Sequence, residues 1–145
     1  MTLPAEAAPE IANGLTLEAW IAIGAYPWNW APAVQRGDDE GYFLGVDGHA
    51  HPGIKVMLTG GPRELTSDRQ LERRRWYHLA GSFDASTGRL RLFVDGELVA
   101  EEEVAGESLR PTAAPVGVGK GRPRRPVDPV RANTFVDSYS LDGLI

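Results

Sequence analysis

The dipeptide Asp95-Gly96 most constrains how this chain can fold, because it lies between two runs rich in apolar residues. Asp-Gly is the strongest short-range signal for a two-residue type I′ turn, which joins antiparallel strands and fixes their register. The turn predicts four cross-strand pairs: Val94 with Glu97, Phe93 with Leu98, Leu92 with Val99 and Arg89 with Glu102. The loop from Asp84 to Gly88 is also typical of a hairpin, so residues 76–104 are expected to form three antiparallel strands. Apolar side chains on both faces of this ribbon indicate a two-layer β protein.

The rest of the chain repeats this pattern of short extended segments between turn residues. Its 17 glycines and 11 prolines leave few windows in which the apolar spacing of a helix could persist. Further strands are predicted at residues 14–23, 32–36, 42–46, 54–58, 115–120 and 133–145. In the first of them, one apolar face is formed by alternate residues: Leu15, Leu17, Ala19, Ile21 and Ile23. Many short strands separated by turns predict an all-β sandwich or jelly roll.

Composition narrows the class of protein further. The 145 residues suit one domain with a full core, with residues 1–13 as a lead segment or weak strand and 14–145 as the folded domain. A net charge of −5 argues against a nucleic-acid binder, since phosphate binding needs a basic surface. No apolar run approaches the roughly 18 residues of a membrane span, and the first residues lack the pattern of a signal peptide. Cysteine is absent, so we expect no disulfide and no thiol chemistry.

Four motifs occur in order along the chain: LTLEAWI at 15–21, GYFLGV at 41–46, WYHLAGSFD at 76–84 and GRLRLFVDGE at 88–97. Together they resemble laminin G-like domains of the concanavalin A-like lectin/glucanase superfamily. Residues 116–119 and 141–145 match the later strands of that pattern, so the resemblance covers about residues 15–145. It implies a jelly roll of two curved antiparallel sheets. It also implies glycan or protein binding on the concave sheet or its rim loops, sometimes with calcium.

Two departures from the family pattern bear on domain organisation. The usual opening strand with a Phe-Asp-Gly motif would lie before residue 1, and the last strand would continue past Ile145. We therefore expect the jelly roll to lack its terminal strands within this chain. The domain would be excised from or continued in a larger protein, or another chain would complete its open strand edge. Because calcium sites in the family draw on those end strands, the resemblance alone does not carry calcium binding over to this chain.

Aromatic residues mark the first candidate ligand-binding loop. Tyr26, Trp28 and Trp30 lie within five residues and are held by prolines, so their faces could carry sugar rings. The alternative is that one tryptophan caps the end of the sandwich core. Trp20 and Trp76 lie within predicted strands instead, and we expect both to pack.

Two further loops carry possible ligands for sugars or metals. Asp38, Asp39 and Glu40 place three carboxylates in one turn, which suits calcium, although Asp also favours turns for its own hydrogen bonding. His49 and His51 alternate beside Asp47, a pattern that fits zinc, sugar contact or simple solvation. The third histidine, His78, lies in a predicted strand and is expected to be a satisfied structural residue.

Charged clusters allow two more interpretations. The basic segments 69–75 and 120–125 could bind an anionic glycan or an acidic partner, or could be solvated loops. The glutamates at 101–103 are relevant because glucanases use carboxylates that project from one strand. The alternating Glu and Asp pattern of those enzymes is absent, and Glu102 is expected to face Arg89. We therefore expect solvated edge carboxylates and no enzyme activity.

The sequence thus favours a non-catalytic carbohydrate-binding module of a larger extracytoplasmic protein, located outside the cell, at its surface or in the periplasm. It would bind a polysaccharide or glycan through the three loops and would require no cofactor, with calcium at the acidic turn as the one candidate. The first alternative is a protein–protein interaction module that adds a strand of another chain to its open edge. A glycoside hydrolase domain is the less favoured alternative.

Overall fold

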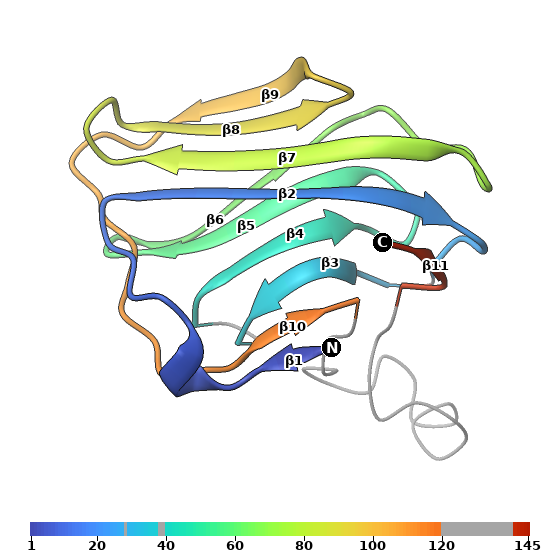
Figure 1. The fold of residues 1–145 in the computed structure, drawn as a ribbon. Coiled ribbons are helices and arrows are strands. Elements are labelled where there is room, and N and C mark those ends of the chain that lie inside the picture. The colour runs from blue at the N-terminus through green and yellow to red at the C-terminus, as the bar shows by residue number, and fades with distance from the viewer. Residues whose placement is uncertain (28, 38–39, 120–140) are drawn as a thin grey trace, which may run out of the picture.

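A computed structural model describes residues 1–27, 29–37, 40–119 and 141–145 of the chain. Within these residues the protein is a sandwich of two antiparallel sheets, with a single short 3-10 helix, η1 (Ala5–Ala7) (Figure 1). The predicted all-β, two-sheet architecture is therefore confirmed. In the described part of the chain, no helix has the length and apolar character needed to cross a membrane.

Sheet A contains six strands in the order β1-β10-β3-β4-β5-β6. Their bounds are β1 (Thr2–Leu3), β10 (Val116–Val118), β3 (Ala31–Arg36), β4 (Tyr42–Val46), β5 (Pro52–Leu58) and β6 (Gly61–Thr66). The sequence did not predict β6, because Gly61 and Pro62 are typical turn residues. Pro62 is tolerated there because β6 is an edge strand, where a missing backbone N–H does not break the sheet.

Sheet B contains five strands in the order β11-β2-β7-β8-β9. Their bounds are β11 (Gly143–Leu144), β2 (Gly14–Ile23), β7 (Trp76–Asp84), β8 (Arg89–Val94) and β9 (Glu97–Glu103). The three-stranded meander predicted for residues 76–104 is confirmed as β7, β8 and β9. Asp95 and Gly96 have φ angles of 53° and 82°, the two positive values that a type I′ turn requires.

The register of β8 and β9 is confirmed beside the turn and is wrong farther from it. Two pairs form as predicted: Val94 with Glu97 and Phe93 with Leu98. After a register shift, the other two are replaced: Leu92 opposes Ala100 and not Val99, and Arg89 opposes Glu103 and not Glu102. The shift marks a β-bulge, and counting residues outward from a turn cannot anticipate an extra residue in one strand.

The core lies between the sheets and is formed by alternate residues of each strand. The predicted inward face of β2 is confirmed, with Leu15, Leu17, Ile21 and Ile23 buried. Gly81 in β7 lets the sheets approach, because a Cβ at that position would lie 2.5 Å from Cδ1 of Ile54 in the facing sheet. With the odd-numbered residues of β2 and β7 turned inward, most of the even-numbered residues lie on an outer face.

The lead segment is fixed to sheet A at both of its ends. Thr2–Leu3 pairs with β10, and the buried guanidinium of Arg36 donates to the carbonyl oxygen of Pro9 at 2.6 Å. The same guanidinium donates to the carbonyl oxygens of Thr112 at 2.9 Å and Ala114 at 3.1 Å. Arg36 therefore joins three chain segments through one buried side chain.

Strand direction determines which loops share an end of the sandwich. The arrowheads of β2 and β4 point the same way in Figure 1, so the loops that follow these strands lie at a common end. Segment 67–75 also lies there, because the Arg74 amide donates to the Ile23 carbonyl at 2.8 Å and the Leu71 amide to the Ala50 carbonyl at 3.0 Å. The turn that precedes β4 lies at the opposite end.

Candidate functional site

Exposed aromatic side chains occupy the outer face of sheet B. Trp20 is 59% exposed and Trp76 is 47% exposed, so the prediction that both pack is wrong. The cause is strand register, because Leu and Ile fill the inward positions of β2 and leave Trp20 on the other side. The sequence contains a signal for this orientation, since Trp20 alternates with the apolar residues and shares a face of the strand with the polar residues Thr16 and Glu18.

Trp20, His78 and Trp76 are neighbours on this face. Trp20 is the cross-strand partner of His78, with ring centroids 5.2 Å apart and an interplanar angle of 50°. Trp76 precedes His78 by two residues in β7, which makes it a diagonal neighbour of Trp20 at a typical separation of about 7–8 Å. Oε2 of Glu18 lies 3.6 Å from Nε2 of His78. We call Glu18, Trp20, Trp76 and His78 the sheet B platform. His78, expected to be structural, belongs to this outer surface.

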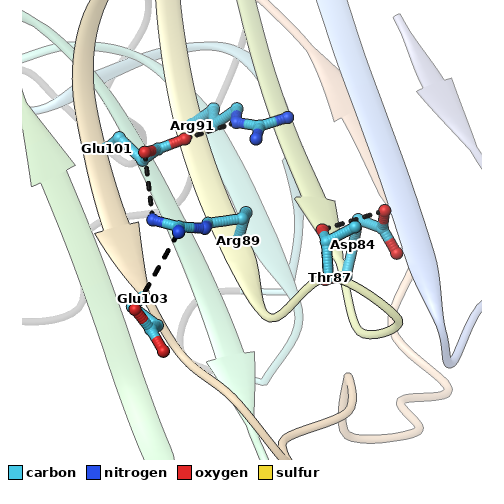
Figure 2. Close-up of polar contacts among 6 residues, drawn as sticks. All are labelled: Asp84, Thr87, Arg89, Arg91, Glu101 and Glu103. Atoms are coloured by element: carbon cyan, nitrogen blue, oxygen red, sulfur yellow. Dashed lines mark hydrogen bonds and ion pairs between the residues drawn. The ribbon is translucent and has the colours of Figure 1, made fainter.

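Ion pairs cover another part of the same sheet, on β8 and β9 (Figure 2). Glu101 accepts hydrogen bonds from Nε of Arg91 at 2.5 Å and from Nη1 of Arg89 at 3.1 Å, and Arg89 lies 4.0 Å from Glu103. The hydrogen bond from Arg91 is the main reason that the pKa of Glu101 lies below its ordinary value, and the two arginine charges add to it. The general acid of a glycosidase needs the opposite shift.

Glu102 lies apart from these ion pairs. Its carboxylate is 3.7 Å from Nε of Arg63 in β6, so the predicted pairing with Arg89 is wrong. The bulge in β9 is the physical reason, because it moves Glu103 into the position opposite Arg89.

Trp30 is covered by its own neighbours on the outer face of sheet A. Its ring meets Phe43 edge to face at a centroid distance of 5.4 Å, and Nζ of Lys55 lies 3.7 Å from the ring centroid. Gly53 provides room for the ring, because a Cβ there would lie 2.7 Å from two of its carbons. Lys55 also pairs with Glu64 at 2.8 Å. The ammonium of Lys55 therefore occupies a face that a sugar would need.

Tyr26 lies in the loop that follows β2 and is 44% exposed. The guanidinium of Arg73 lies 5.2 Å from its ring centroid. Other arginines of the segment 69–75 also have partners: Arg69 lies 3.7 Å from Asp95, and Arg75 contacts the ring of Tyr77 at 5.1 Å. This basic segment is thus largely engaged by acidic and aromatic side chains. The second basic segment, 120–125, and the aromatic residue Trp28 lie outside the described residues.

Glu40, the described member of the acidic turn, lies away from the other predicted loops. Asp38 and Asp39 fall outside the described residues. Glu40 accepts a hydrogen bond from Oγ1 of Thr112 at 3.3 Å. Because β4 separates this turn from the loop at residues 47–51, the structure does not bring Glu40 together with the histidines.

Asp47, His49 and His51 form a compact group in the loop between β4 and β5. One potential ligand atom from each residue lies within 4.8 Å of the others. The imidazole rings are stacked, with centroids 5.9 Å apart and an interplanar angle of 27°. Burial alone would raise the pKa of Asp47, but hydrogen bonds from His51 and His49 outweigh burial and hold it below its ordinary value. The loop therefore presents a carboxylate and two imidazoles together.

Comparison with protein families identifies the fold. A laminin G-type family model, described as the concanavalin A-like lectin/glucanases superfamily, matches residues 1–133. The chain belongs to this superfamily. The resemblance noted in the sequence is thereby confirmed, and among curated proteins no sequence matches the chain significantly.

Several solved structures share this fold at low sequence identity. Domains LG4-5 of the mouse laminin alpha1 chain align with a TM-score of 0.68 and 15% identity over 98% of this chain and 36% of theirs. The CBM40 of a Ruminococcus gnavus sialidase, bound to alpha2,3 sialyllactose, aligns with a TM-score of 0.66 and 16% identity, over 92% of this chain and 71% of its own. A candidate carbohydrate-binding protein from Bacteroides ovatus aligns with a TM-score of 0.63 and 18% identity, over 90% of this chain and 35% of its own. The chain spans less than two thirds of several solved chains that it matches.

Proposed function

We propose that this domain is a non-catalytic carbohydrate-binding module that uses the sheet B platform. The observation that carries the proposal is the exposure of Trp20 and Trp76 on neighbouring strands of a regular sheet. Large aromatic faces bury much area at little entropic cost, because their side chains have few rotatable bonds. Rigid strands hold the two indoles in place before any ligand arrives.

Polar groups beside the indoles suit a sugar better than a purely apolar ligand. The imidazole of His78 and the carboxylate of Glu18 lie at the same platform and can exchange hydrogen bonds with hydroxyl groups. A few polar groups among aromatic surfaces are the usual composition of a small-molecule site. The sialyllactose-bound CBM40 and the Bacteroides ovatus protein support this class of ligand by their likeness in fold.

The loop residues predicted from the sequence take a secondary place in this proposal. Tyr26 follows the end of β2, the strand that carries Trp20, and would extend the contact surface beyond the sheet. Trp30 would contact a ligand only after Lys55 moves from its ring. The acidic turn remains a proposed calcium site, which would be separate from the sugar site.

The biological setting follows from the weakness expected of such a surface. A shallow platform would bind one sugar chain modestly, and linkage to a larger protein would raise the effective concentration at a polysaccharide. We propose that the parent protein is extracellular, on the cell surface or in the periplasm, where such ligands occur.

Binding to a glycan array, followed by calorimetry on the best ligand, tests the proposal. Trp20→Ala and Trp76→Ala should each weaken binding at least tenfold, or about 1.4 kcal/mol, while leaving thermal unfolding nearly unchanged. Leu98→Ala is the matched control, because it also removes an exposed apolar side chain from sheet B. Glycan binding that survives the double tryptophan variant would refute the platform as the site.

The second candidate is an interaction module that accepts a strand from another chain. In the described residues, β11 pairs with β2 only at Gly143 and Leu144, so no described strand covers the edge of β2 from Gly14 to Ile21. Self-association in sedimentation experiments, without any glycan signal, would favour this candidate. The less favoured glycoside hydrolase would require hydrolysis of a glycan that is lost in Glu103→Gln.

A further inference from the structure

The loop between β4 and β5 holds a set of metal-binding groups that the sugar platform does not use. Two of the three histidines of the chain, His49 and His51, lie there beside Asp47. The group belongs to the end of the sandwich, whereas the platform lies on the outer face of sheet B. The proposed sugar site therefore does not explain why these three side chains lie together.

The spacing of these groups is close to that of a tetrahedral metal centre. Bonds of about 2.0–2.1 Å to a tetrahedral ion place neighbouring ligand atoms roughly 3.3 Å apart. Oδ2 of Asp47 lies 3.2 Å from Nδ1 of His51, which already matches one edge of such a tetrahedron. The third ligand atom, from His49, lies within 4.8 Å of the others. His49 is exposed, so its ring can turn by the small distance that remains.

The loop holds the carboxylate in an orientation that turns one oxygen toward the imidazoles. Oδ1 of Asp47 accepts hydrogen bonds from the amides of His49 at 2.8 Å and His51 at 2.9 Å. Oδ2 is hydrogen-bonded to Nδ1 of His51 at 3.2 Å, a contact that a metal ion between the two atoms would replace. Nε2 of Gln70 donates to the carbonyl of His49 at 2.8 Å and ties this loop to the neighbouring segment. Such outer contacts orient the ligands of a metal site before the ion binds.

We propose that Asp47, His49 and His51 bind a zinc ion. Two imidazoles and one carboxylate suit a borderline-soft divalent ion, whereas calcium prefers a larger shell made of oxygens alone. Three protein ligands leave the fourth tetrahedral position for water or for an atom of a bound molecule. The zinc ion would also join the ends of the loop and stabilise the folded protein by mass action.

Zinc titration of the untagged full chain tests this proposal by calorimetry and thermal unfolding. We expect one ion per chain, a rise in unfolding temperature with zinc, and no matching rise with calcium or magnesium. His49→Gln, His51→Gln and Asp47→Asn should each weaken zinc binding at least tenfold. Asp47→Asn keeps an oxygen that can accept the two amide hydrogen bonds, so it removes the charge and preserves the loop.

The matched control is His78→Gln, which removes the remaining histidine and should change zinc affinity less than twofold. Cobalt substitution gives an independent readout, because tetrahedral coordination produces strong visible absorption that the His49→Gln, His51→Gln double variant should lack. Absence of stoichiometric zinc binding would overturn the proposal, and so would full binding by that double variant. Trp20→Ala should retain zinc, which separates this test from the test of sugar binding.

Discussion

The tryptophans on the outer faces of the two sheets differ in how far neighbouring side chains cover them. On sheet A, Trp30 packs against Phe43 and lies under the ammonium of Lys55. On sheet B, Trp20 and Trp76 remain about half exposed or more, and the small imidazole of His78 in β7 lies opposite Trp20. The difference teaches that neighbours, and not the residue type or its place in a loop or strand, decide whether an aromatic face is available.

This difference assigns separate roles to the two regions. A cation held over an aromatic ring contributes about 0.5–1 kcal/mol at exposed sites, so the contacts of Trp30 mainly stabilise the fold. Exposed indoles gain little from folding and retain their surface for a ligand. Variants that separate stability from binding can therefore test the comparison.

Trp30→Ala should have the largest effect on stability. Removal of a half-buried indole leaves a gap beside Phe43 and Gly53, and we expect a loss of about 2 kcal/mol in the free energy of unfolding. Trp76→Ala should change this free energy by less than about 0.5 kcal/mol. Urea unfolding followed by circular dichroism measures both, since that signal does not depend on tryptophan fluorescence. Equal losses in the two variants would contradict the comparison.

Several features behind this comparison were predictable from local sequence alone. The turn at Asp95-Gly96 fixes the meander because its φ angles demand those residues. The alternation in residues 14–23 predicts the buried side of β2, and the same alternation places Trp20 on the outside. The general tendency of tryptophan to be buried overrode this pattern in the prediction, and the local pattern was the better guide.

Other features depend on contacts between distant parts of the chain. The platform exists because β2 pairs with β7, more than fifty residues away, which brings Trp20 beside His78. The ring of Trp30 is covered by Lys55 from another strand, and the sequence of the aromatic loop does not predict this contact. The bulge in β9 likewise cannot be predicted from the type of turn that precedes the strand. By contrast, the grouping of Asp47, His49 and His51 was visible as a local pattern.

Gly53→Ala should sharpen the comparison with a smaller effect. The new methyl group would lie 2.7 Å from the Trp30 ring, and we expect a loss of about 1–2 kcal/mol from overpacking. The loss should fall below about 1 kcal/mol when Trp30→Ala is also present, because the ring that clashes is gone. Gly14→Ala is the matched control, since its nearest neighbour would be 3.7 Å away. Additive costs in the double variant would show that Gly53 does not serve Trp30.

The smallest effect should come from the ion pairs of β8 and β9, which distinguish the charged part of sheet B from its aromatic part. The lowered pKa of Glu101 means that the folded state favours the ionised carboxylate. Its contribution to stability should be present above the ordinary glutamate pKa of about 4.5 and should be lost as the pH falls through the lowered value. Urea midpoints measured between pH 7 and pH 3 should therefore fall less for Glu101→Gln than for the unmodified protein.

Sugar binding provides the second half of this last test. Glu101→Gln removes a charge from the face that carries the platform without touching Trp20 or Trp76, so glycan affinity at pH 7 should stay within twofold. High salt should weaken the pH effect on stability, because exposed ion pairs are screened. A large loss of glycan affinity in Glu101→Gln would mean that the ligand reaches across β8 and β9. The charged part of the face would then belong to the binding site, and the division between the two parts would have to be redrawn.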